Sequence, residues 1–171
     1  MPAVTGRRPS HLARAVLLAL ALLLGLVGGG AAAQDAQCPR WRAAFLSMPF
    51  RAATIELRER PVALRIKVAD TPERQAAGFQ CATVPEIDRH LILFDFGGEI
   101  VSQFHMRNVP APLDIAFAKA DGRIFAILRM DPSPTALYGP MGAFRYALEA
   151  RAGFFAQHGI TQGEARLVPD S

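Results

Sequence analysis

From residue 54 onward, the sequence is a series of short apolar segments separated by turn-forming residues. In the segment Val62–Ala69, large apolar residues occupy every second position. A period of two is typical of a β-strand that is buried on one face. Leu113–Ala118 and Ile124–Met130 flank a turn at Asp121–Gly122, which predicts a hairpin. Segments of this length restrict the chain to a fold built mainly from strands.

The other segments predict further strands and two short helices. Thr71 can cap a helix that begins at Pro72 and ends at Gly78, and a second helix is expected from Phe154 to His158. Seven or eight short strands with one or two short helices predict a mainly β fold, a compact antiparallel sandwich or barrel. The additional strands are expected at residues 54–57, 91–96, 100–104, 146–149 and 165–168.

The N-terminus has the pattern of an export signal. Arg7, Arg8 and Arg14 precede an apolar run of 13 residues, which is shorter than the roughly 20 residues of a membrane span. We therefore predict a cleavable signal peptide over residues 1–33, an N-terminal arm over 34–53 and one β-rich domain over 54–168. The signal predicts a periplasmic or secreted protein that meets the membrane only during export.

Removal of the signal peptide changes the charge of the chain. The whole sequence has 19 Lys plus Arg against 15 Asp plus Glu. Three of the arginines and none of the acids lie in residues 1–33, so about 16 basic residues remain against 15 acidic ones. Because nucleic-acid binding needs a concentrated basic face, this near-neutral balance argues against a nucleic-acid partner.

The sequence has two cysteines, Cys38 and Cys81. A disulfide between them would persist in an exported protein, and in the chain-entropy model a closed loop of roughly 44 residues contributes about 4 kcal/mol. A reactive thiol and a metal ligand are the competing interpretations, and neither has partner residues at a known spacing.

Five blocks occur in an order that resembles the bacterial and archaeal family known as domain of unknown function 192. The resemblance covers roughly residues 54–168, and it implies a compact β-rich fold, often exported, with no established substrate. The blocks are Val68–Arg74 leading to Gly78, Leu93–Phe96, Phe104–Asn108 with Pro112–Phe117, Asp121–Ile124, and Tyr146–Ala150 with Gly153.

Two departures from the family pattern stand out. His105 replaces the tryptophan that members usually carry between Phe and Met. Gly78-Phe79-Gln80-Cys81 replaces the usual Gly-Leu-Met that is followed closely by Arg. The resemblance implies that the roles of these positions are altered here, and that Cys81 can tie this edge of the domain to the N-terminal arm.

A polar cluster around a proline-interrupted loop is the candidate site. In an extended strand, Gln103, His105 and Arg107 share one face. The functional interpretation is a shallow pocket in which Arg107 holds an anion, Asn108 orients a carbonyl or hydroxyl, and His105 or Asp114 moves a proton. The structural interpretation pairs Asp114 with Arg107 and lets Asn108 close the loop through backbone bonds. The candidate ligand-binding residues are Gln103, His105, Arg107, Asn108 and Asp114.

Other polar residues have simpler interpretations. The sequence has none of the common His and Cys spacings of transition-metal sites, no nucleophile motif and no phosphate-binding loop, so we expect no metal and no cofactor. Asp70 suits a helix entry, and Glu149 is expected to pair with an arginine such as Arg74. His90 and His158 are expected to be structural.

These observations favour binding over catalysis. The leading hypothesis is a periplasmic domain that binds a small polar or anionic ligand, or an envelope component, at the candidate residues. The first alternative is a hydrolase or lyase acting on an envelope carbohydrate, with Asp114 or Glu149 as acid or base and His105 assisting. The second alternative is a structural or assembly role.

Overall fold

The computed structural model describes residues 29–58 and 60–170. The chain divides into two compact units, Met1–Gln37 and Cys38–Ser171. Most of the predicted signal peptide lies outside the described residues, and its last residues fall in helix α2 (Gly29–Ser47). The predicted arm over 34–53 therefore starts in a helix. No helix among the described residues is both long and apolar enough to cross a membrane.

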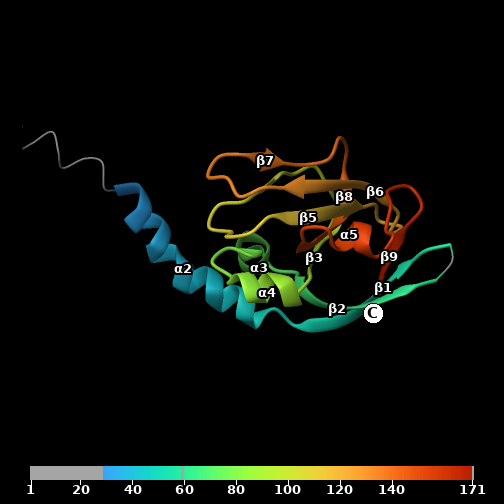
Figure 1. Ribbon diagram of the computed structural model, residues 1–171, viewed down its shortest axis with the longest axis horizontal. Coiled ribbons are helices and arrows are strands. Elements are labelled where there is room, and N and C mark those ends of the chain that lie inside the picture. The colour runs from blue at the N-terminus through green and yellow to red at the C-terminus, as the bar shows by residue number, and fades with distance from the viewer. Residues whose placement is uncertain (1–28, 59, 171) are drawn as a thin grey trace, which may run out of the picture. The chain divides into compact units, whose positions relative to one another are not determined.

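A seven-stranded sheet forms the second unit and curls into a half-barrel (Figure 1). β2 and β3 run parallel, while the other paired strands of this sheet run antiparallel. The mainly β prediction is confirmed. In spatial order, the strands are β6 (Ile124–Met130), β5 (Leu113–Ala118), β8 (Phe144–Arg151), β3 (Ile92–Ile100), β2 (Val62–Ala69), β1 (Phe50–Glu56) and β9 (Arg166–Pro169).

Smaller elements complete the unit. β4 (Phe104–His105) pairs with β7 (Leu137–Tyr138), and the helices are α3 (Pro72–Ala77), α4 (Val84–Arg89) and α5 (Phe154–Gln157). The sequence predicted α3 and α5 but not α4. Thr83 and Glu86 form a capping box at the start of α4, so its signal was present in the sequence.

One predicted strand is shorter than expected. Although a Gly-Gly pair is a common hairpin turn, β3 runs through Gly97 and Gly98 to Ile100 with an irregular register. Gly97 has φ +71°, a conformation that glycine adopts without strain. Residues 101–103 lie outside any strand. Of the strand predicted over 100–104, only Phe104 pairs with β7, and the following residue, His105, extends this pairing.

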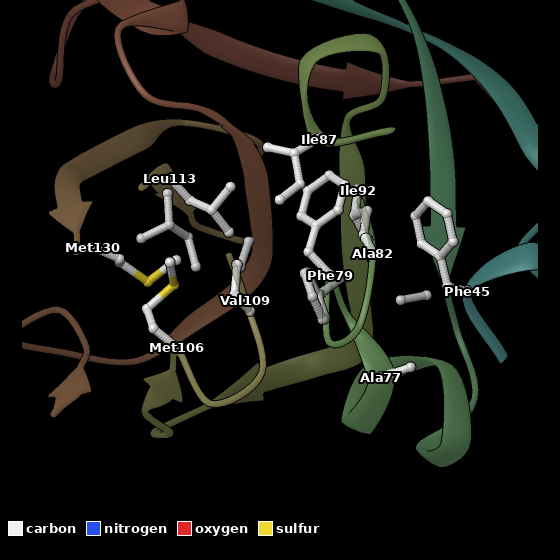
Figure 2. Close-up of a cluster of buried hydrophobic side chains, with 14 of the residues drawn as sticks. Phe45, Ala77, Phe79, Ala82, Ile87, Ile92, Met106, Val109, Leu113 and Met130 are labelled. Atoms are coloured by element: carbon white, nitrogen blue, oxygen red, sulfur yellow. The ribbon is translucent and has the colours of Figure 1, made fainter. Parts of the chain in front are cut away.

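The sheet carries an apolar core on each face. α3 and α4 contribute Ala77 and Ile87 to one core, which also contains Phe94 and Phe117 of the sheet. Figure 2 shows part of this cluster, from Phe45 to Met130. α5 contributes Phe155 to the second core on the other face. Successive residues of β5 and β8 alternate between the two cores, as a strand with both faces covered requires.

A disulfide joins Cys38 in α2 to Cys81, which lies between α3 and α4. The two Cα atoms are 5.5 Å apart. Arg42 donates to both carboxylate oxygens of Glu86 at 3.0 Å and to the carbonyl of Cys81 at 3.0 Å. The Arg42 guanidinium lowers the pKa of Glu86 to about 2. Of the three interpretations of the cysteines, the structure therefore supports the disulfide.

Candidate ligand-binding pocket

A cavity of about 240 Å³ lies beside α3 and is bounded by residues of β3, β4 and β8. Both apolar rings and polar side chains line it. The aromatic residues are Phe79, Phe94, Phe96 and Phe104, and the polar ones are Gln75, Gln80, Ser102, Gln103, His105 and Glu149. No lysine or arginine is among the described residues that line this cavity.

Glu149 is the most unusual of these residues. It lies in the middle of β8, opposite Ile92 of β3 and Ile115 of β5, and its exposure is only 4%. Its Oε2 atom is buried and has no hydrogen-bond partner among the described residues. Burial raises the pKa of Glu149 to about 8. At neutral pH the carboxyl group is therefore mostly protonated, and it can both donate and accept a hydrogen bond.

Gly78 keeps the space next to this carboxyl group open. A Cβ atom at residue 78 would lie 3.4 Å from Oε2 of Glu149 and 3.3 Å from Cζ of Phe94. Gly78 has φ +46°, which residues with side chains rarely adopt, and its amide donates to the carbonyl of Arg74 at the end of α3. The end of this helix thus sets the width of the cavity.

His105 lines the same cavity from β4. Its Nδ1 atom is buried and has no partner within the described part of the chain. Burial lowers the pKa of His105, and the nearby charge of Arg107 lowers it further. The imidazole is therefore neutral at physiological pH, and its free ring nitrogen can donate or accept according to its tautomer.

The amide side chains of the wall are held by the backbone. Gln75 Nε2 donates to the carbonyl of Asp95 at 2.9 Å, and Gln80 Nε2 donates to the carbonyl of Ala76 at 2.7 Å. Gln80 also accepts a long bond of 3.4 Å from Asn108 Nδ2. These bonds fix the orientation of both side chains, and each amide keeps acceptor capacity at its oxygen and one further N–H donor.

Comparison with known proteins places the chain in a family. Residues 53–166 match the family DUF192, described as Uncharacterized ACR. The chain belongs to the DUF192 family. No curated protein matches it.

Two solved structures have a fold similar to that of this DUF192 protein. One, from Sinorhizobium meliloti 1021, is described as a "putative transcription regulator"; the identity is 25%, the TM-score is 0.65, and the match covers 72% of this chain and 95% of that one. The other, from Novosphingobium aromaticivorans DSM 12444, is a protein of unknown function with 25% identity, a TM-score of 0.62, and coverage of 69% and 84%.

The DUF192 domain brings only part of the predicted site together. Gln103 and His105 line the cavity, whereas Asn108 is not in its lining and bonds to Gln80, which is. Asn108 has φ +57°, and its carbonyl accepts from the amide of Cys81 at 2.8 Å. Arg107 is exposed in a turn and does not line the cavity, so it is not placed to hold an anion there.

Asp114 lies on the opposite face of the sheet from Glu149. Ile115 is the β5 residue directly across from Glu149, and the alternation along the strand turns Asp114 the other way. Asp114 accepts from Arg129 Nε at 2.5 Å and from the amide of Gly153 at 2.6 Å. The expected pair with Arg107 is therefore replaced by a pair with Arg129, the residue across from Asp114 on β6.

Glu149 was predicted as half of an ion pair, and this prediction is wrong. Arg74 binds Asp70 at 2.7 Å instead, one helical turn away. The sequence held a signal for the observed role, because Glu149 is the one acid in the apolar segment Tyr146–Ala150. A carboxyl group in a strand that is covered on both faces has to be buried, and burial is costly without a partner.

Proposed function

We propose that this DUF192 protein is an exported binding domain that holds a small polar ligand in the cavity beside Glu149 and His105, without catalysis. The observation that carries the proposal is the buried Glu149 Oε2 atom, which has no partner among the described residues and borders a cavity. An unsatisfied buried polar group costs roughly 1–3 kcal/mol. A ligand that bonds to this atom would offset that cost.

The composition of the cavity wall also supports binding. Apolar rings with a few converging polar groups are typical of small-molecule sites. A volume of about 240 Å³ suits a small ligand. An anionic ligand would need Arg107, which is exposed and lies outside the wall, so we propose a polar ligand that is not an anion.

Two features support the exported location. The sequence of residues 1–33 has the arginines and the apolar run of an export signal. The disulfide between Cys38 and Cys81 is of a kind that persists in oxidising compartments and is rare in the cytosol. Both observations agree with a periplasmic or secreted protein.

Carbohydrate cleavage fits the site less well. Glycoside hydrolysis usually needs two carboxyl groups roughly 5–10 Å apart, on either side of the scissile bond. Among the described residues, Glu149 is the one carboxyl group that lines this cavity, and Asp114 lies on the other face of the sheet. A binding site does not need a second carboxyl group beside Glu149.

A thermal-shift screen of the exported protein tests the proposal. The panel contains sugars, amines, amides, carboxylates and fragments of the cell envelope. At least one class should raise the melting temperature, since a ligand at 100 times its Kd stabilises a protein by about 2.7 kcal/mol. Glu149→Gln and His105→Ala should reduce this shift.

Arg107→Ala is the matched control, because it removes a predicted site residue that lies outside the cavity wall. Its shift should equal that of the wild type. A shift that is lost in Arg107→Ala but kept in Glu149→Gln would place binding on the exposed loop and contradict the proposal. If no class produces a shift and the variants only lower the melting temperature, the structural role is supported instead.

A further inference from the structure

We infer that the ligand of this cavity is an amine, bound as an ammonium ion between the Glu149 carboxylate and the aromatic rings of the wall. The inference rests on the proposed binding function and names its ligand class. It follows from three features of the wall: the buried polar atoms without a partner, the absence of a lysine or arginine from the described lining, and the aromatic rings that line the cavity together with Glu149.

Two buried polar atoms of the wall have no partner among the described residues, Oε2 of Glu149 and Nδ1 of His105, and both can accept a hydrogen bond. The amide nitrogens of Gln75 and Gln80 each donate one N–H to a backbone carbonyl. Glu149 in its ionised form can only accept. A wall of this kind fits a ligand with several donors, and an ammonium group has three donors and no acceptor.

The charge of the wall also favours a cationic ligand. Glu149 is the one ionisable acid in the lining, and no lysine or arginine lines the cavity among the described residues. The charged groups of the helices on this face are engaged elsewhere or exposed. Arg74 forms an ion pair with Asp70, and Glu86 forms one with Arg42. The remaining charged residues of α3 and α4 are exposed: Glu73, Asp88 and Arg89. In the described part of the lining, His105 is the other titratable side chain, and it is neutral at physiological pH. A bound cation would supply the counter-charge that Glu149 lacks.

Aromatic rings supply the third feature. Phe94, Phe96 and Phe104 line the cavity together with Glu149. Phe94 and Phe104 meet edge to face with their centroids 5.1 Å apart, and Phe94 lies parallel to Phe96 at 6.4 Å. A carboxylate beside aromatic rings is a combination that binds alkylammonium ions, since ring faces attract cations within about 6 Å.

Binding would be coupled to the release of a proton. Glu149 holds its proton at neutral pH because burial raises its pKa to about 8. An ammonium ion favours the carboxylate form, so the complex forms as the Glu149 proton passes to the buffer. Near pH 7, each bound amine should release close to one proton.

Calorimetric titration with three probes of equal chain length tests the inference. Butylammonium should bind the wild type at least about tenfold more tightly than 1-butanol, because hydrogen bonds to charged groups are the stronger ones. Butyrate should bind more weakly than either. Titrations at pH 7 in buffers of different ionisation enthalpy should report a proton released by butylammonium and none by 1-butanol.

Two variants complete the experiment. Glu149→Gln should abolish both the preference for the amine and the proton release. Asp114→Asn removes the same charge from the opposite face of the sheet and should keep both. The proton count on the wild type does not depend on how well either variant folds.

The inference is overturned if butylammonium does not bind, if 1-butanol or butyrate binds as tightly, or if Glu149→Gln keeps the preference. Binding of 1-butanol or a sugar that Glu149→Gln weakens, with no preference for amines, would leave the proposed binding function standing. The two ideas can therefore fail separately.

Discussion

At the scale of single residues, Glu149 and Asp114 show how one strand pair treats two buried acids differently. Asp114 faces Arg129 and the amide of Gly153, so its charge is matched by donors. Glu149 faces aliphatic and aromatic neighbours, and burial alone raises its pKa to about 8. A structural acid and a candidate ligand-binding acid thus lie on adjacent strands, one on each face.

The raised pKa of Glu149 predicts a pH-dependent stability. Below about pH 4.5 the carboxyl group is protonated in both the folded and the unfolded chain, so it has no effect. Between about pH 4.5 and 8 the unfolded chain loses the proton while the folded chain keeps it. The free energy of unfolding should therefore fall as the pH rises, by up to about 1.4 kcal/mol per pH unit, and level off above pH 8.

Urea denaturation of the wild type and Glu149→Gln across this pH range measures the effect. Their difference isolates Glu149, because the other titrating groups, including His90 and His105, are common to both proteins. The difference should change steadily through the window and then become constant. Parallel stability curves would show that Glu149 is not held protonated by the fold.

At the scale of secondary-structure elements, the sequence predicted what depends on local pattern. The sequence predicted the alternation at β2, the turn between β5 and β6 and the Thr71 cap of α3, because each depends on neighbouring residues. The sequence did not predict the cavity. It joins the end of α3 to β3, β4 and β8, and the pairing of these segments is decided by contacts between residues far apart in the sequence.

The same limit explains the mixed outcome at the predicted site. Gln103 and His105 were grouped because alternate residues of an extended segment share one face, and both line the cavity. Asp114 was grouped with them because it is close in sequence. Its face is set by the register of β5 against β8, which the sequence alone does not reveal.

The disulfide is the element-scale feature with the largest expected effect on stability. Cys38 and Cys81 are separated by 43 residues, and a closed loop of this size is worth about 4 kcal/mol in the chain-entropy model. In chemical denaturation, the free energy of unfolding of the double variant Cys38→Ser, Cys81→Ser should be lower than that of the wild type by up to about 4 kcal/mol. Wild-type protein treated with a reductant should fall to the level of the variant. Equal midpoints with and without reductant would contradict this role.

At the scale of the whole unit Cys38–Ser171, one sheet separates two cores. Strands β3, β5 and β8 contribute side chains to both cores, so neither face can lose its packing without disturbing the other. The single tryptophan, Trp41, packs against the core that contains Phe117. Its fluorescence reports on one face, while far-ultraviolet circular dichroism reports on the strands.

We therefore predict that the unit unfolds in a single cooperative transition. Phe117→Ala on one face should cost about 3–5 kcal/mol, and Leu148→Ala on the other about 2–5 kcal/mol. In each variant the fluorescence and dichroism transitions should coincide and shift together. If Phe117→Ala shifts the midpoint of the fluorescence transition and Leu148→Ala leaves it unchanged, the two cores unfold separately.

The glycine at the end of α3 constrains how this cavity can change during evolution. Gly78 has a backbone conformation that other residues adopt only with strain, so this wall cannot be narrowed by small successive substitutions. His105 faces the same space from a short strand, and its backbone is not in the left-handed region. Residue 105 can therefore exchange its side chain without backbone strain, so the range of ligands that the cavity accepts is open to change at this position.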